Sequence, residues 1–197
     1  MQTVLFLPGA GGSQLFWRPV SDQLPKEWRK EHFGWPGLGN EPHDPTVNSI
    51  DDLVDAVKRR ILTPVDIVAQ SMGGVVAASL ALSHPEIVRR LVLVVTSAGV
   101  NMARFGSSDW RADYQKQFPN AAKWIVEQRA AAELPVEKIS APTLLIWGDA
   151  DPISPAGVGH HLSQRIARSK LHVLRGGHDL AQARASEVAA LIRQHLS

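Results

Sequence analysis

The most constraining feature of the sequence is the alternation of short apolar runs with longer stretches of helical period. The apolar runs are rich in Val, Leu and Ile and lack strict polar alternation, which is typical of strands covered on both faces. The predicted strands are residues 3–7, 28–33, 64–69, 88–96, 142–147 and 170–174, and the predicted helices are residues 50–61, 72–83 and 181–196. This order predicts an α/β fold with three α/β/α layers around a mainly parallel six-stranded sheet.

Residues 99–139 interrupt the alternation, because about forty residues pass without a strand signal. Aromatic residues recur there at roughly helical intervals, which predicts short helices. A length of 197 residues fits one domain better than two, and it is enough to bury a sizeable core. We therefore expect a single domain over residues 1–197, with residues 99–139 as a small helical cap inserted within it.

Composition and charge exclude several classes of function. The chain has no Cys, which excludes disulfide scaffolds, thiolate zinc sites and thiol nucleophiles and leaves oxygen and imidazole groups for catalysis. Its 21 Lys and Arg residues nearly balance its 19 Asp and Glu residues, so no nucleic-acid partner is expected. No apolar stretch approaches the roughly 20 residues of a membrane span, and no secretory signal is seen. We expect a cytoplasmic protein without membrane association.

A serine lies at the junction between a predicted buried strand and a predicted buried helix. In residues 66–74, Ser71 stands at this junction, and the residues two before and two after it are small, Ala69 and Gly73. A sharp turn from strand to helix needs small neighbours, because the backbones beside the serine come close together. The hydroxyl would then lie at a helix N-terminus, which favours a developing oxyanion. A simple N-cap is the alternative reading of the same residues.

Acidic and imidazole groups follow two later strands, at the sheet edge where ligands gather in open α/β folds. Asp149 and Asp151 follow the strand at 142–147, and His178 follows the strand at 170–174. Ser, Asp, His is the chain order of the α/β-hydrolase triad. The spacing alone leaves both aspartates open as the triad acid.

Over essentially its full length, the chain resembles the α/β-hydrolase superfamily, without the usual leading antiparallel hairpin. Gln70-Ser71-Met72-Gly73 looks like the nucleophile elbow, and Gly177-His178 resembles the turn of the general base. The segment 148–153 is similar to the loop that carries the acid and places that acid at Asp151 rather than Asp149. The resemblance thus implies the catalytic residues Ser71, Asp151 and His178. It also implies an oxyanion hole made of the backbone N–H groups of Ala10, in the loop 7–12, and Met72.

Apolar residues near these motifs are candidates for substrate binding. In the predicted cap they are Met102 and Trp110, and just after the oxyanion loop they are Leu15, Phe16 and Trp17. The alternative for each is packing within the core.

Two other motifs are weaker. Residues 9–14 begin like a dinucleotide-binding loop, but Gln14 stands at the third glycine position and no acidic residue ends a second strand about 20 residues later. His160 and His161 are adjacent, so they point in different directions from a helix, and a surface pair is favoured over a metal site.

These features predict a serine hydrolase that cleaves small-molecule carboxylic esters through an acyl-enzyme, with no cofactor and no metal. The alternatives are a ligand-binding or sensor protein on the same scaffold, and another serine-dependent branch of the superfamily: a thioesterase, a C–C hydrolase or a cofactor-free haloperoxidase. No oligomeric state is predicted.

Overall fold

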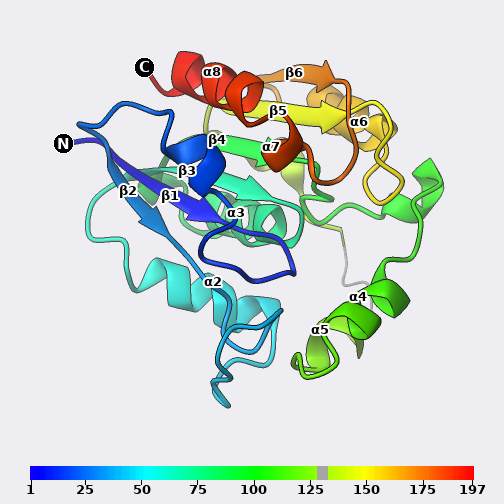
Figure 1. Cartoon of the computed structure of the whole chain (residues 1–197). Coiled ribbons are helices and arrows are strands. Elements are labelled where there is room, and N and C mark those ends of the chain that lie inside the picture. Colours follow the sequence, from blue (N-terminus) through cyan, green and yellow to red (C-terminus); the bar gives the residue numbers. More distant parts are fainter. Residues whose placement is uncertain (128–132) are drawn as a thin grey trace.

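The computed structural model describes residues 1–127 and 133–197, and residues 128–132, which belong to the predicted cap, lie outside the described residues. The described chain forms a six-stranded sheet with the spatial order β2-β1-β3-β4-β5-β6, in which every neighbouring pair is parallel (Figure 1). The strands are β1 (Thr3–Leu7), β2 (Arg29–His32), β3 (Val65–Gln70), β4 (Val88–Val94), β5 (Thr143–Gly148) and β6 (Ser169–Leu174). The predicted α/β fold and all six predicted strands are confirmed.

Burial along the strands explains their apolar character. Every residue of β3 and β5 is buried, because both strands lie inside the sheet and helices cover both of their faces. The predicted strand at 88–96 is too long by two residues. It ends at Val94 because Val95 has a φ of 41°, which turns the chain out of the extended conformation.

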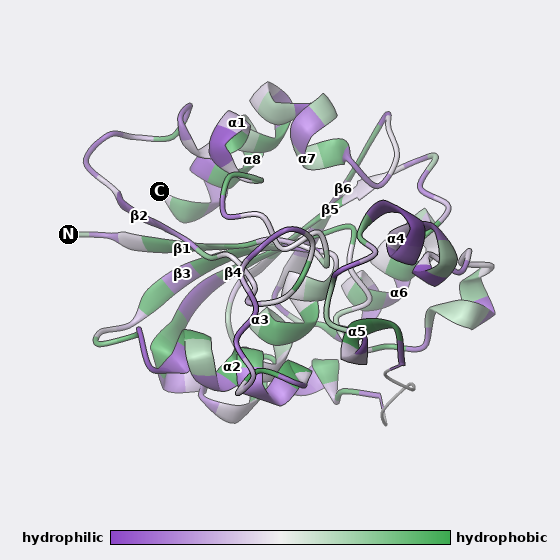
Figure 2. Cartoon of the chain, turned by 60° about the horizontal axis from the view of Figure 1, so that its bottom comes forward, coloured by the Kyte–Doolittle hydropathy of each residue, from purple (hydrophilic) through white to green (hydrophobic). Residues whose placement is uncertain are grey.

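Helices cover the two faces of the sheet in two groups (Figure 2). On one face lie α1 (Arg18–Ser21), α7 (Leu180–Ala183) and α8 (Ala185–Leu196), and on the other lie α2 (Ile50–Lys58), α3 (Met72–Ser83) and α6 (Ala156–Arg165). Helix α2 is amphipathic and buries Leu53 and Val57, and its N-cap Ser49 accepts a hydrogen bond from the Asp52 N–H at 3.1 Å. Helix α3 is apolar all round because the sheet, α2 and other elements surround it.

The helix predicted at 181–196 is wrong in one respect, since the chain forms two helices there. Arg184 separates α7 from α8 with a non-helical backbone (φ −124°, ψ 36°), and its guanidinium donates to the carbonyl of Arg175. Helix α6 was not among the helices predicted from the sequence.

The predicted cap contains short helices, in line with its aromatic spacing. They are η2 (Met102–Phe105), α4 (Arg111–Gln117), α5 (Trp124–Glu127) and η3 (Val136–Lys138), and no strand occurs in the part of 99–139 that the structure describes. In Figure 1, α4 and α5 lie at the end of the molecule toward which the strands point, where the loops after the strands gather.

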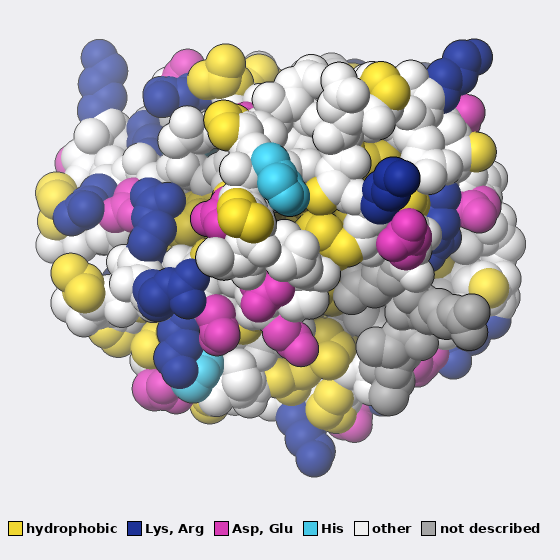
Figure 3. All heavy atoms as spheres, turned by 90° about the horizontal axis from the view of Figure 1, so that it is seen from below, with side chains coloured by type: hydrophobic (Ala, Val, Ile, Leu, Met, Phe, Trp, Pro, Cys, Tyr) yellow, Lys and Arg dark blue, Asp and Glu magenta, His cyan; other side chains and the backbone are white. Residues whose placement is uncertain are grey.

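Surface charge is mixed. On the face seen in Figure 3, Lys and Arg side chains are interspersed with Asp and Glu side chains, consistent with a formal net charge of only +2. In the described residues, no helix is both long and apolar enough to span a bilayer.

Candidate active site

Ser71 occupies a strained turn between β3 and α3. Its backbone has a φ of 50° and a ψ of −121°, a region that non-glycine residues rarely adopt. The turn is held by a hydrogen bond from the Ser71 N–H to the Val94 carbonyl at 3.0 Å. At Gly73, a Cβ atom would lie 2.4 Å from the Pro8 carbonyl oxygen, so only glycine fits there. The small residues around Ser71 are thus explained by close backbone packing.

Three side chains from different strand ends meet at this turn. His178 Nε2 lies 2.9 Å from Ser71 Oγ, and His178 Nδ1 lies 2.8 Å from Asp151 Oδ2. The Asp151 side chain is fully buried, whereas the imidazole is 23% exposed. With the Nδ1–H donating to Asp151, Nε2 is left to accept the Ser71 hydroxyl proton. The structure thus brings together the three residues that the sequence indicated.

The two aspartates of the loop after β5 have different partners. Asp151 Oδ1 accepts hydrogen bonds from the N–H groups of Ile153 at 2.8 Å and Ser154 at 3.0 Å, which aim its other oxygen at the imidazole. Asp149 Oδ1 instead accepts from the Gly176 N–H at 3.0 Å. Asp149 therefore ties the loop after β5 to the loop after β6, and Asp151 is the carboxylate that contacts His178.

Polar residues that the sequence analysis did not single out support this arrangement. Gln70, buried at the end of β3, donates from Nε2 to the backbone carbonyl of His178 at 3.2 Å. Thr96 donates from Oγ1 to the Ser71 carbonyl at 2.5 Å, and Ser154 donates to the Thr96 carbonyl at 3.3 Å. A polar residue at the end of a mostly apolar strand was the available signal for Gln70.

The two predicted oxyanion donors lie on segments that flank Ser71. Met72 is the first residue of α3, so its N–H has no partner within the helix. Ala10 belongs to the loop after β1, where the Gly12 N–H donates to the Gly9 carbonyl at 3.0 Å. A Cβ at Gly9 would lie 3.2 Å from Ser71 Cβ, so this loop lies directly against the serine.

The predicted binding residues have different environments. Leu15 is 67% exposed, and Phe16 is partly buried beside it. The prediction that Trp17 binds substrate is wrong, because its side chain belongs to the core. Trp17 is 1% exposed, its indole N–H donates to the Leu7 carbonyl, and its ring packs against Phe6. In the cap, Met102 begins η2, which packs against α6, and Trp110 packs edge-on against Tyr114.

The adjacent histidines of α6 also lie apart from the triad. His160 is exposed, whereas His161 lies 2.9 Å from the Arg104 guanidinium. Burial, and then the positive charges of Arg104 and Arg165, lower the pKa of His161 below its ordinary value. Across residues 1–127 and 133–197, no group of three or more His, Cys, Asp or Glu side chains is arranged to hold a metal ion.

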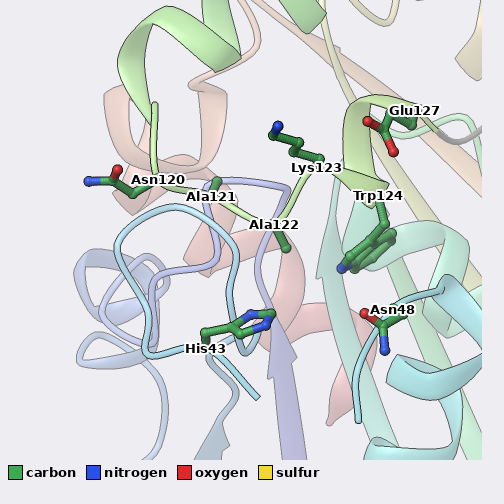
Figure 4. Close-up of a pocket in the computed structure, with 8 residues that line it drawn as sticks. All are labelled: His43, Asn48, Asn120, Ala121, Ala122, Lys123, Trp124 and Glu127. Atoms are coloured by element: carbon green, nitrogen blue, oxygen red, sulfur yellow. The ribbon is translucent and has the colours of Figure 1, made fainter. Parts of the chain in front are cut away.

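A hollow of about 480 Å³ lies between the segment before α2 and the segment around α5 (Figure 4). Its lining includes His43 and Asn48, from the segment before α2, and Ala122 and Trp124, from the segment around α5. None of its lining residues belongs to the triad.

Comparison with known proteins agrees with the fold. A model of the alpha/beta hydrolase family matches residues 4–191. A pimeloyl-[acyl-carrier protein] methyl ester esterase of Neisseria meningitidis serogroup A is 28% identical over 98% of this chain and 76% of its own length. A 2-hydroxymuconate semialdehyde hydrolase of Pseudomonas sp. is 27% identical over 92% of this chain and 81% of its own length.

Solved structures have the same fold. The enol-lactonase from Burkholderia xenovorans superposes with a TM-score of 0.79 at 20% identity, covering 99% of this chain and 91% of that one. The serine hydrolase CarC of carbazole degradation superposes with a TM-score of 0.78 at 21% identity, covering 100% of this chain and 91% of that one.

Proposed function

The chain belongs to the alpha/beta hydrolase family and is a hydrolase, and on that premise we propose that it cleaves carboxylic esters through the triad Ser71, His178 and Asp151. The observation that carries the proposal is the continuous contact from Ser71 Oγ through both imidazole nitrogens to a buried carboxylate, at 2.9 and 2.8 Å. These are hydrogen-bond distances between a nucleophile, a base and an orienting group.

In the first half of the reaction, Ser71 Oγ attacks the acyl carbon while His178 Nε2 takes its proton. The positive charge that develops on the imidazole faces Asp151, whose carboxylate is fully buried and hydrogen-bonded to two backbone N–H groups. His178 then gives the proton to the leaving alcohol, which departs and leaves an ester bond between the acyl group and Ser71. Asp151 also holds the imidazole in the tautomer that this transfer requires.

The negative charge on the substrate oxygen needs donors that are in place beforehand. We assign this role to the N–H groups of Met72, at the start of α3, and Ala10, in the loop after β1, which flank Ser71. The N-terminus of α3 adds its positive dipole end at the same point. Water then attacks the acyl-enzyme while His178 takes its proton, and the bond between the acyl group and Ser71 Oγ breaks as His178 returns that proton to Oγ and the acid is released.

The relatives point to the kind of ester. Four of the similar proteins from Neisseria meningitidis are named as methyl ester esterases acting on a pimeloyl chain linked to a carrier protein. We therefore propose an ester with a small alcohol and an apolar acyl chain as the substrate. The exposed Leu15 beside the oxyanion loop offers apolar surface for such a chain.

The decisive experiment compares wild type with Ser71→Ala on methyl esters of increasing acyl length. We expect steady turnover by the wild type, loss of at least about 10⁴-fold in kcat in Ser71→Ala, and loss of labelling by a fluorophosphonate. Ser186→Ala is the matched control, since Ser186 is exposed on α8, and it should keep both properties. A stoichiometric burst without turnover would favour a sensor protein, and a Ser71→Ala protein that still hydrolyses the esters would contradict the proposal.

A carbon–carbon hydrolase is the second candidate, because the semialdehyde hydrolase matches 92% of this chain. The same triad would serve, with the leaving group a stabilised carbanion instead of an alkoxide. Measuring kcat/KM for 2-hydroxymuconate semialdehyde beside the methyl esters separates the two functions. A higher value for the semialdehyde would replace the ester proposal with this one.

A further inference from the structure

Tyr114 is a residue of the cap that reaches into the body of the protein. It lies on α4, is 8% exposed, and packs against Trp110 and Phe118 at ring-centroid distances of 5.5 and 5.1 Å. Its hydroxyl donates to the Ala10 carbonyl at 2.9 Å and accepts from the Gly39 N–H at 2.9 Å. Both hydrogen-bonding functions of the phenol are therefore used on backbone groups.

These two partners are central to the geometry of the oxyanion loop. The hydrogen bond from the Gly12 N–H to the Gly9 carbonyl orients the peptide that carries the Ala10 N–H, because a trans peptide places its N–H opposite its carbonyl. Tyr114 orients the next peptide, through the Ala10 carbonyl. Both peptides that flank the Ala10 Cα atom are thus held, one within the loop and one from the cap.

The loop needs an external tether because its own residues give it little rigidity. Gly9, Gly11 and Gly12 surround Ala10, and a Cβ at Gly11 would meet no atom within 4 Å. Glycine loses more conformational entropy on ordering than any other residue. The segment around Gly39 also packs directly against the oxyanion loop, since a Cβ at Gly39 would lie 1.9 Å from the Gly11 carbonyl oxygen.

We propose that Tyr114 is a positioning residue for the oxyanion hole, through which the cap controls the stabilisation of the transition state. The inference rests on the proposed function, because it assigns the Ala10 N–H to the oxyanion. The inference goes beyond the proposed function because it gives the cap a role in the chemical step as well as in substrate contact.

The test is Tyr114→Phe, which keeps the ring and its packing and removes only the hydroxyl. Removing an oxyanion donor outright costs about 10²–10³ in kcat, so we expect loss of its positioning to lower kcat by about tenfold, with KM within about twofold of wild type. Affinity for an alkyl boronic acid, which forms a tetrahedral adduct on serine, should fall in parallel. The pH dependence of kcat should not change, because His178 is not touched.

Ser49→Ala is the matched control. It also removes one hydroxyl that bonds a backbone N–H, at the N-cap of α2, and it should leave kcat and boronate affinity unchanged. A Tyr114→Phe protein with wild-type kcat, or one that only raises KM, would overturn the inference. So would an equal loss of kcat in Ser49→Ala. Ser71-dependent turnover by the wild type keeps the proposed function standing in each of these cases.

A second measurement does not depend on the folding of a variant. Tyr114 is the only tyrosine of the chain, so a ¹³C label at the tyrosine Cζ atom, which carries the hydroxyl, gives one NMR signal. We expect this signal to shift when a fluorophosphonate reacts with Ser71 and its oxygen enters the oxyanion hole. The signal should not respond to the reagent in Ser71→Ala. An unshifted signal in fully labelled wild type would contradict the coupling.

Discussion

The two halves of the candidate active site are held in different ways. Ser71, Asp151 and His178 lie on short turns directly after β3, β5 and β6, where the sheet and buried hydrogen bonds hold them. The oxyanion loop around Ala10 is glycine-rich, and its tethers come from segments far along the chain, at Trp35, Gly39 and Tyr114. We infer that the sheet determines the geometry of the proposed triad, whereas the geometry of the proposed oxyanion hole depends on how the predicted cap and the loop after β2 pack.

The largest effect should come from the triad half. Asp151→Asn keeps the size of the side chain but removes the charge that faces His178, so we expect kcat to fall by about 10³-fold or more. Asp149→Asn is the matched control two residues away, and it should change kcat by less than about tenfold. Steady-state kinetics on one ester, giving kcat for both variants and the wild type, shows which aspartate acts with His178. A large loss in Asp149→Asn together with a mild one in Asp151→Asn would reverse the assignment.

On the oxyanion half, Gly39→Ala should damage activity and stability together. Gly39 has a φ of 57°, and the new methyl group would meet the Gly11 carbonyl oxygen at 1.9 Å, next to Ala10. We expect a loss of at least about 2 kcal/mol in the free energy of unfolding and of about tenfold in kcat. Denaturant unfolding and kinetics measure the two effects.

Gly106→Ala controls for backbone strain in this comparison. Gly106 has a φ of 75°, but a Cβ there meets no atom within 4 Å. We expect it to cost about 1–2 kcal/mol of stability and to leave kcat unchanged. If both glycine variants lose activity equally, strain alone explains the effect and the oxyanion loop is not specifically sensitive.

Thr96→Val is the counterpart of Tyr114→Phe on the sheet side. It removes a hydroxyl that donates to the Ser71 carbonyl and accepts from the Ala98 N–H, so we expect a loss of about 1–3 kcal/mol in the free energy of unfolding. The Ser71 turn keeps its backbone hydrogen bonds to Val94 and Gly74, and kcat should therefore stay within about threefold of wild type. A loss of kcat as large as that of Tyr114→Phe would remove the distinction between the two halves.

The smallest effect concerns pH and a residue outside both halves. His32, on β2, stacks on Phe6, and its two ring nitrogens have no hydrogen-bond partner among the described residues. Burial, and then the positive charge of Arg18, lower the pKa of His32 below its ordinary value of 6.5. The negative charge of Asp22 raises this pKa, and the positive charge of Lys30 lowers it further. As the pH falls below about 6.5, the unfolded chain therefore binds a proton that the native state does not, and the free energy of unfolding decreases.

Thermal unfolding at pH 7 and pH 5 measures this effect. Wild type should lose more stability over that interval than His32→Leu, in which the titrating group is gone. His160→Gln, at an exposed position, should follow the wild type. An equal loss in His32→Leu and wild type would show that other groups cause the acid sensitivity.

Much of the fold and of the triad was predictable from sequence because the signals are local. The apolar runs that become β3 and β5, the small residues around Ser71, and the positions of His178 and the two aspartates after their strands all follow from neighbours within a few residues. Periodicity and turn chemistry act over that range. The same local signals overextended the strand at β4 and joined α7 to α8, because the backbone turns at Val95 and Arg184 depend on contacts outside their own segments.

The order of strands and helices along the chain and the chemical groups at the strand ends could be read from the amino-acid sequence, and the family resemblance indicated Asp151 as the acid. The spatial order of the strands, the place of Trp17 in the core and the contact of Tyr114 with Ala10 are known only from the folded structure. The physical reason is the separation along the chain. Tyr114 and Ala10 are 104 residues apart, so their contact depends on the packing of every element between them, which no local pattern records.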